Sequence, residues 1–67
     1  MKSPDILYAE VGKVMADGSS KETIGALEMF LTIWSDYALA HNDLGVLYFK
    51  EGEKEKALEH YERAAQL

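Results

Sequence analysis

The chain has two histidines, His41 and His60, the side chains best suited to acid–base catalysis or to transition-metal binding near neutral pH. Helices that bind metal place a second histidine or an acid one turn from the first, and neither histidine has such a partner four residues away. Asp43 follows His41 by two residues, so the two side chains point in different directions on a helix. We expect His60 to point outward from the last helix.

The sequence offers little support for other catalytic arrangements. Ser35 and Asp36 fall in a turn, where helix capping accounts for both. The chain has no cysteine, hence no thiolate nucleophile or metal ligand, and it has no glycine-rich phosphate loop. The sequence therefore predicts a protein that is not an enzyme and uses neither a cofactor nor a metal.

The charge balance excludes two classes of partner. The 67 residues include twelve acidic and seven basic side chains, for a net charge of −5, and neither half forms a basic patch. Nucleic acid and an anionic membrane surface are therefore poor partners. No apolar run approaches the roughly 20 residues of a membrane span, and the N-terminus does not look like a secretory signal. We expect a cytoplasmic protein.

Apolar residues recur at helical spacing in four segments, which predict helices over 4–16, 20–34, 37–50 and 54–66. The first two segments are expected to bury stripes that include Ile6, Met15 and Ile33. No segment alternates as a strand would. The expected fold class is all-α.

Residues at the ends of these segments predict how each helix is capped. Ser3 is placed as the first N-cap, and Ser19 with Glu22 has the spacing of a capping box. Gly18 is expected to end the first helix in the left-handed conformation. Asp36 is expected to cap the third helix.

Two glycines interrupt the pattern of the C-terminal half. Glycine inside a helix costs about 1 kcal/mol relative to alanine, so Gly45 needs a compensating contact. The expected contact is a close approach of Tyr61, with small Ala57 and Ala64 one turn to either side. Gly52 lies between two helices and is expected to form the turn.

Residues 38–67 resemble the tetratricopeptide repeat, a 34-residue helix–turn–helix unit. The resemblance rests on the residues at the signature positions: Leu44, Gly45, Tyr48, Gly52, Ala57, Tyr61 and Ala64. His41 stands where the family usually has tryptophan, which implies a histidine packed in the core. The proline that usually closes the repeat is not in the chain.

The first half contains a weaker echo of the same unit. Gly12 echoes Gly45, and Ala26 echoes Ala57, but the two intervals differ by two residues. We interpret 1–67 as one domain of four short antiparallel helices, stacked as a degenerate hairpin over 4–37 and a repeat over 38–67. The alternative is an unrelated helical hairpin in the first half.

By this resemblance, the first helix of each unit lines a groove that grips peptides or partner helices. The matching positions are Leu39, Asn42, Val46, Phe49 and Lys50, with Lys13 in the first unit. Val46 and Phe49 could instead belong to the core or to a dimer contact. A second apolar surface, on which another unit or another copy would stack, comprises Leu58, Tyr61, Ala65 and Leu67.

Three functions fit these patterns. The first is a non-catalytic interaction module that binds a protein or peptide through the groove. The second is self-assembly, in which the apolar side of the last helix pairs two copies as a homodimer. The third is an appendage of a larger enzyme, as in bacterial glycosyltransferases and methyltransferases that carry similar repeats.

Overall fold

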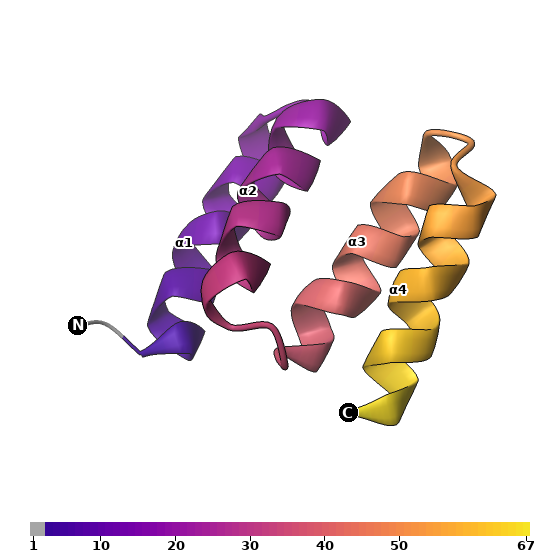
Figure 1. Ribbon diagram of the computed structural model, residues 1–67. Coiled ribbons are helices and arrows are strands. Elements are labelled where there is room, and N and C mark those ends of the chain that lie inside the picture. Colours follow the sequence, from indigo (N-terminus) through magenta and orange to yellow (C-terminus); the bar gives the residue numbers. More distant parts are fainter. Residues whose placement is uncertain (1–2) are drawn as a thin grey trace.

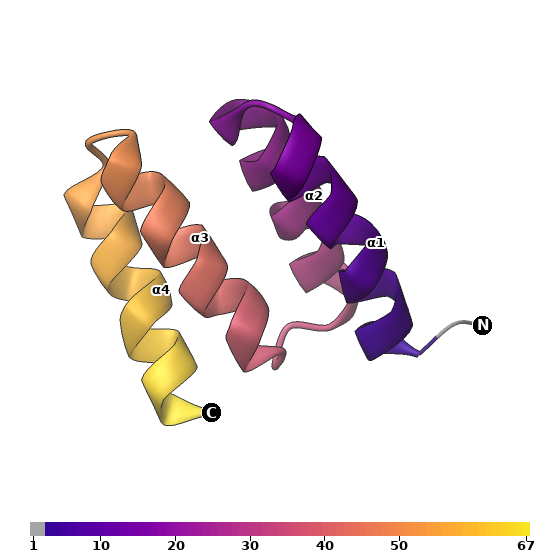
Figure 2. The same cartoon turned by 180° about the vertical axis from the view of Figure 1, so that it is seen from behind.

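The computed structural model describes residues 3–67, which form four helices: α1 (Pro4–Asp17), α2 (Ser20–Ile33), α3 (Ala38–Lys50) and α4 (Lys54–Gln66). α1 and α2 form one antiparallel hairpin, and α3 and α4 form a second beside it (Figures 1 and 2). The turns of both hairpins lie at one end of the molecule, and the α2–α3 connection lies at the other. The predicted all-α fold is confirmed, with helix ends within one residue of expectation.

Local signals account for several helix ends. The Ser3 hydroxyl accepts a hydrogen bond from the Ile6 N–H at 3.3 Å, and the Ser19 hydroxyl accepts one from the Glu22 N–H at 3.2 Å. Each bond satisfies an N–H group that has no partner inside its helix. Gly52 has φ +80 in the turn between α3 and α4, a conformation that suits glycine. These predictions are confirmed.

Two predicted helix ends are wrong. Gly18 is extended, with φ −94, and its N–H bonds the Val14 carbonyl, so the end of α1 needs no left-handed residue. Tyr37, not Asp36, occupies the N-cap position of α3, and no side chain caps this helix. The Asp36 carboxylate instead lies 3.5 Å from the Arg63 guanidinium of α4. Asp36 thus forms an ion pair with α4 instead of the α3 cap that the local pattern predicted.

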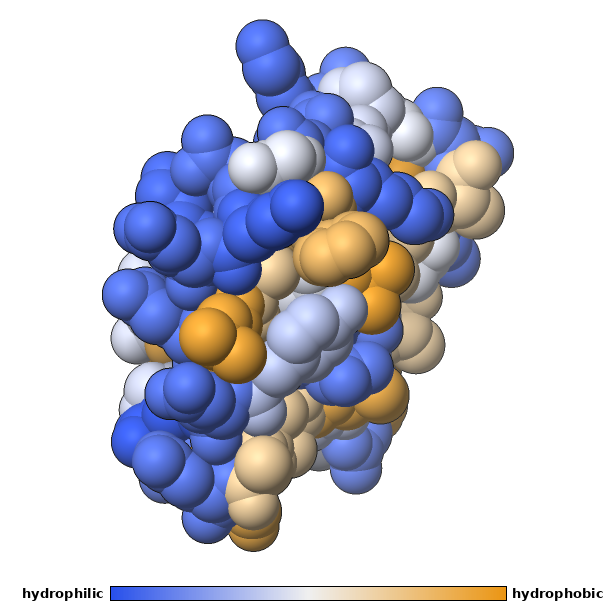
Figure 3. Space-filling view, turned by 90° about the vertical axis from the view of Figure 1, so that its right-hand side faces the viewer, coloured by the Kyte–Doolittle hydropathy of each residue, from blue (hydrophilic) through white to orange (hydrophobic). Residues whose placement is uncertain are grey.

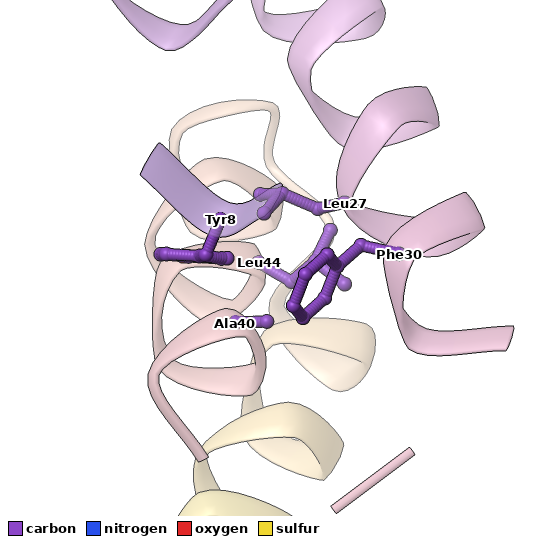
Figure 4. Close-up of a cluster of buried hydrophobic side chains, with 5 residues drawn as sticks. All are labelled: Tyr8, Leu27, Phe30, Ala40 and Leu44. Carbon is purple, nitrogen blue, oxygen red and sulfur yellow. The ribbon is translucent and has the colours of Figure 1, made fainter. Parts of the chain in front are cut away.

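The core lies where the two hairpins meet. Its buried side chains come from α1, α2 and α3 and converge on one another in Figure 4: Tyr8, Leu27, Phe30, Ala40 and Leu44. The Tyr8 and Phe30 rings meet edge to face with centroids 5.1 Å apart, a favoured aromatic geometry.

The buried side of α1 is centred on Tyr8, because α1 packs against α3 as well as α2. Three residues that the apolar pattern placed inside are exposed: Ile6, Met15 and Ile33. The prediction for these three is wrong, because periodicity gives the apolar side of a helix but not which of its residues face a neighbouring helix.

Tyrosine–carboxylate hydrogen bonds join the two hairpins at three places among the described residues: Tyr8 to Asp43, Tyr37 to Asp5 and Tyr48 to Glu28. Burial and the neighbouring carboxylate raise the pKa of Tyr8 above its usual range, and the same two causes raise the pKa of Tyr48 to about 12. Both hydroxyls therefore stay protonated as donors at neutral pH. These bonds fix how the second hairpin sits on the first.

Candidate partner-binding surface

One side of α3 is free of the core. Ala40 and Leu44 point into the core and are fully buried, whereas the opposite side is exposed to solvent. That exposed side has the helical spacing of a single stripe, formed by Leu39, Asn42, Val46, Phe49 and Lys50. All five predicted groove residues of α3 therefore lie together. The sixth, Lys13, is exposed on α1.

The contact between α3 and α4 extends this surface across both helices. The Tyr61 ring lies directly on Gly45, where a Cβ atom would come within 2.6 Å of the ring. Because the helices are antiparallel, Phe49, one turn beyond Gly45, lies across from Leu58, one turn before Tyr61. Phe49 and Leu58 are each 58 % exposed.

We call this surface the outer face and define it by five residues: Val46, Phe49, Leu58, Tyr61 and Ala65. Figure 3 looks onto this side of the molecule, and hydrophobic atoms gather there in a band bordered by hydrophilic ones. The remaining exposed positions of α4 are mostly charged, including Lys54, Glu55, Glu59 and Arg63. The outer face is thus an apolar patch that two helices share.

The first hairpin contains a covered counterpart of the outer face. By the sequence echo, Leu27 of α2 corresponds to Leu58 of α4, and Phe30 corresponds to Tyr61. Leu27 is 0 % exposed and Phe30 is 5 % exposed, because α3 packs over them. Leu58 lacks such a cover and is 58 % exposed. The outer face therefore has the composition of an inter-helix contact, and Leu58 on it is exposed among the described residues.

The four residues predicted for stacking or dimer contact all remain accessible. Leu58, Ala65 and Leu67 are exposed, and Tyr61 is half-buried by its contact with Gly45. The predicted groove and the predicted stacking surface both lie on the α3–α4 hairpin. Antiparallel packing about the Gly45–Tyr61 contact brings the Phe49 end of the groove toward Leu58.

The signature residues occupy structural positions. Leu44 and Ala57 are buried, and Ala64 is half-buried beside them in the α3–α4 contact. The Gly45–Tyr61 contact confirms the predicted close approach. These residues hold the two helices together beneath the outer face, so they support the surface without forming most of it.

The position of His60 was predicted wrongly. His60 does not point outward: its Nδ1 lies 3.1 Å from Nδ1 of His41, and its ring is parallel to that of Tyr48. His41 is buried, as the resemblance implied. The sequence contained a signal for this contact, since His41 lies one turn before Gly45 and His60 directly precedes Tyr61.

A second apolar hollow lies on the other side of the molecule, between α1 and α2. It has a volume of about 370 Å³, and its apolar lining includes Leu7, Val11, Val14, Met29, Ile33 and Trp34. Met29 is 72 % exposed beside it. This hollow includes none of the predicted site residues.

Two other kinds of site were considered for the described residues: a metal centre and a membrane-spanning helix. Among residues 3–67, no three histidine or carboxylate side chains gather as metal ligands. None of the helices there combines the length and the apolar character needed to cross a bilayer.

Comparison with known proteins identifies one segment. The model of the tetratricopeptide repeat family matches residues 38–67, which are the α3–α4 hairpin and Leu67 after it. No curated protein and no solved structure matches the chain. The predicted resemblance of this segment is therefore confirmed, and repeats of this family generally mediate contacts between proteins.

Proposed function

We propose, on the premise that residues 38–67 are a tetratricopeptide repeat, that the chain binds a protein partner through its outer face and the adjoining stripe of α3. The observation that supports this proposal is that Phe49 of α3 and Leu58 of α4 are each 58 % exposed on two helices that pack through the Gly45–Tyr61 contact. Contiguous apolar patches rimmed by polar residues often mark interaction sites on soluble proteins. The chain performs no chemistry in this role.

The partner that best fits the surface is an amphipathic helix or an extended peptide. Leu39, Val46 and Phe49 offer apolar contacts along α3, and Asn42 and Lys50 beside them can bond polar groups of the partner. The helices that present these side chains are fixed by the Gly45–Tyr61 contact and by the core, so shape selects the partner. Lys13 would contribute only to a partner long enough to reach α1.

Phe49→Ala is expected to weaken binding while leaving the fold intact. Substituting an exposed side chain usually changes the free energy of unfolding by no more than about 0.5 kcal/mol. Truncating an aromatic anchor in an interface costs more than about 1 kcal/mol of binding free energy, which is several-fold in Kd. The probe is a peptide selected from a displayed random library against the wild-type chain. Its Kd is measured by calorimetry, and the melting temperature is measured alongside.

Met29→Ala is the matched control, because Met29 is similarly exposed but lies beside the α1–α2 hollow. Peptides that lose affinity for the Phe49 variant and retain it for the Met29 variant support the proposal. If Phe49→Ala lowers the melting temperature as a core truncation would, Phe49 is structural and the proposed surface is wrong. If only Met29→Ala weakens binding, the site is the hollow.

Self-association is the second candidate, and the covered counterpart of the outer face favours it. The face that corresponds to it in the first hairpin is covered by a helix of this same chain, so a helix of a second copy is a chemically suitable cover. Sedimentation equilibrium over a wide concentration range separates the candidates. A dimer that persists on dilution and dissociates in Leu58→Glu favours self-association, and a monomer favours a different partner.

A further inference from the structure

The imidazole rings of His41 and His60 are in contact between α3 and α4. Their Nδ1 atoms are 3.1 Å apart and their ring centroids are 5.3 Å apart. The centroid distance exceeds the Nδ1–Nδ1 distance by about twice the distance from an imidazole centre to one of its ring atoms. Both Nδ1 atoms therefore lie near the line between the two ring centres. Each nitrogen therefore points at the other, which is the geometry of an N–H···N hydrogen bond.

The hydrogen bond of His41 Nε2 determines which ring nitrogens of the pair carry a proton. His41 Nε2 lies 2.8 Å from the Ser35 carbonyl oxygen, which can only accept, so Nε2 carries a proton. In the neutral side chain, His41 Nδ1 is then bare and accepts. His60 must donate from Nδ1, which leaves His60 Nε2 bare and without a partner among the described residues.

This geometry suits a proton and not a metal ion. A bound Zn²⁺ would need about 2.0–2.1 Å to each nitrogen, with the two lone pairs converging from different directions. Two nitrogens that face each other along a line at 3.1 Å leave no position that satisfies both bonds. The pair is a hydrogen-bonded contact between helices.

We propose that the His41–His60 pair makes the α3–α4 hairpin sensitive to pH, because the folded pair accepts one added proton and excludes a second. The first proton binds His60 Nε2 and leaves the bridging bond unchanged. A second proton would have to bind His41 Nδ1. Two N–H groups and two positive charges would then face each other, and the contact would open.

The charged and titratable groups around the pair come from three helices. Glu28 of α2 and Glu59 of α4 favour the charged form of His60, whereas burial and His41 oppose it and lower the pKa of His60 overall. Tyr48 of α3 stacks on His60 and keeps its hydroxyl bonded to Glu28. Lys56 of α4 lies 5.4 Å from the centre of the Tyr48 ring.

The sign of the effect follows from proton counts. In the unfolded chain both histidines bind protons at a pKa of about 6.5. The folded pair binds fewer protons, so stability is fully present above pH about 6.5 and falls as the pH is lowered. Each proton that only the unfolded chain binds raises the unfolding equilibrium constant about tenfold per pH unit. Acid therefore loosens the hairpin that presents the outer face.

Imidazole nitrogen NMR on the wild-type chain tests the bridge directly. At pH 8 we expect His41 protonated on Nε2 and His60 protonated on Nδ1. On lowering the pH, the folded chain should take up one proton at the pair before it loosens. Two Nε2-protonated rings, or two independent titrations near pH 6.5, would overturn the proposal.

Urea unfolding at several pH values between 8 and 5 tests the consequence. In His60→Gln, the amide can still donate to His41 Nδ1 and, after turning over, can accept from protonated His41. We therefore expect the variant to lose less stability on acidification, by about tenfold in the unfolding constant for each pH unit below about 6.5. The same loss in both proteins would assign the pH effect to carboxylates and would refute the proposal. If the variant does not fold, the NMR measurement decides alone.

Discussion

Leu27→Ala is expected to destabilise the chain by about 2–5 kcal/mol, the range for truncating a fully buried leucine. Leu27 is 0 % exposed and lies in the core that joins the two hairpins. A chain of 67 residues has a total stability of roughly 3–10 kcal/mol, so this single change removes a large share of it. Urea or thermal unfolding followed by circular dichroism measures the effect.

Leu58→Ala supplies the matched comparison, because Leu58 corresponds to Leu27 in the second hairpin and is 58 % exposed. We expect it to change stability by no more than about 0.5 kcal/mol. The contrast tests whether the outer face lacks a cover in the free chain. Equal and large losses would mean that Leu58 is buried in solution, as in a dimer, and would favour self-association.

Short-range signals predicted the helices well. Periodicity located all four helices, and the hydroxyls of Ser3 and Ser19 accept the expected capping bonds. These features depend on residues within about one turn of each other. A single sequence contains that information because the backbone N–H and the capping side chain are neighbours along the chain.

Apart from Gly18, which bonds Val14 of its own helix, three errors arose where a distant partner decided the outcome. Asp36 faces Arg63, His60 faces His41, and Tyr8 reaches α3 as well as α2. In each case the partner lies in another helix, and no local rule indicates it. The exposed positions of α3 follow from the same periodicity that identifies its buried side, and their role in binding stays a prediction.

The two hairpins also differ at their corresponding glycines. A Cβ atom at Gly12 would meet nothing within 4 Å outside its own helix, whereas one at Gly45 would meet the Tyr61 ring. Phe30, the counterpart of Tyr61, packs on Tyr8 and Trp34 instead. The first hairpin thus lacks at Gly12 the close approach that the second has at Gly45.

Gly45→Ala is expected to destabilise the chain by up to about 2 kcal/mol, and Gly45→Leu by more. Alanine gains about 1 kcal/mol of helix propensity, but overpacking a filled contact costs about 1–3 kcal/mol. The added methyl would lie 2.6 Å from Tyr61 Cε1 and 2.8 Å from Cδ1, so the ring or the helix must move. The free energy of unfolding is measured by urea titration.

Gly12→Ala is the control for propensity alone, since Gly12 is also helical and its added methyl meets no neighbour. It should stabilise the chain by about 0.5–1 kcal/mol, opposite in sign to Gly45→Ala. In a Tyr61→Ala background the obstacle is gone, so Gly45→Ala should become neutral or stabilising, and the two sites should be strongly coupled. If Gly45→Ala stabilises the wild-type chain as Gly12→Ala does, the Tyr61 ring moves aside without a cost in free energy of unfolding. The glycine would then not be needed for the close packing of α3 and α4 on which the outer face depends.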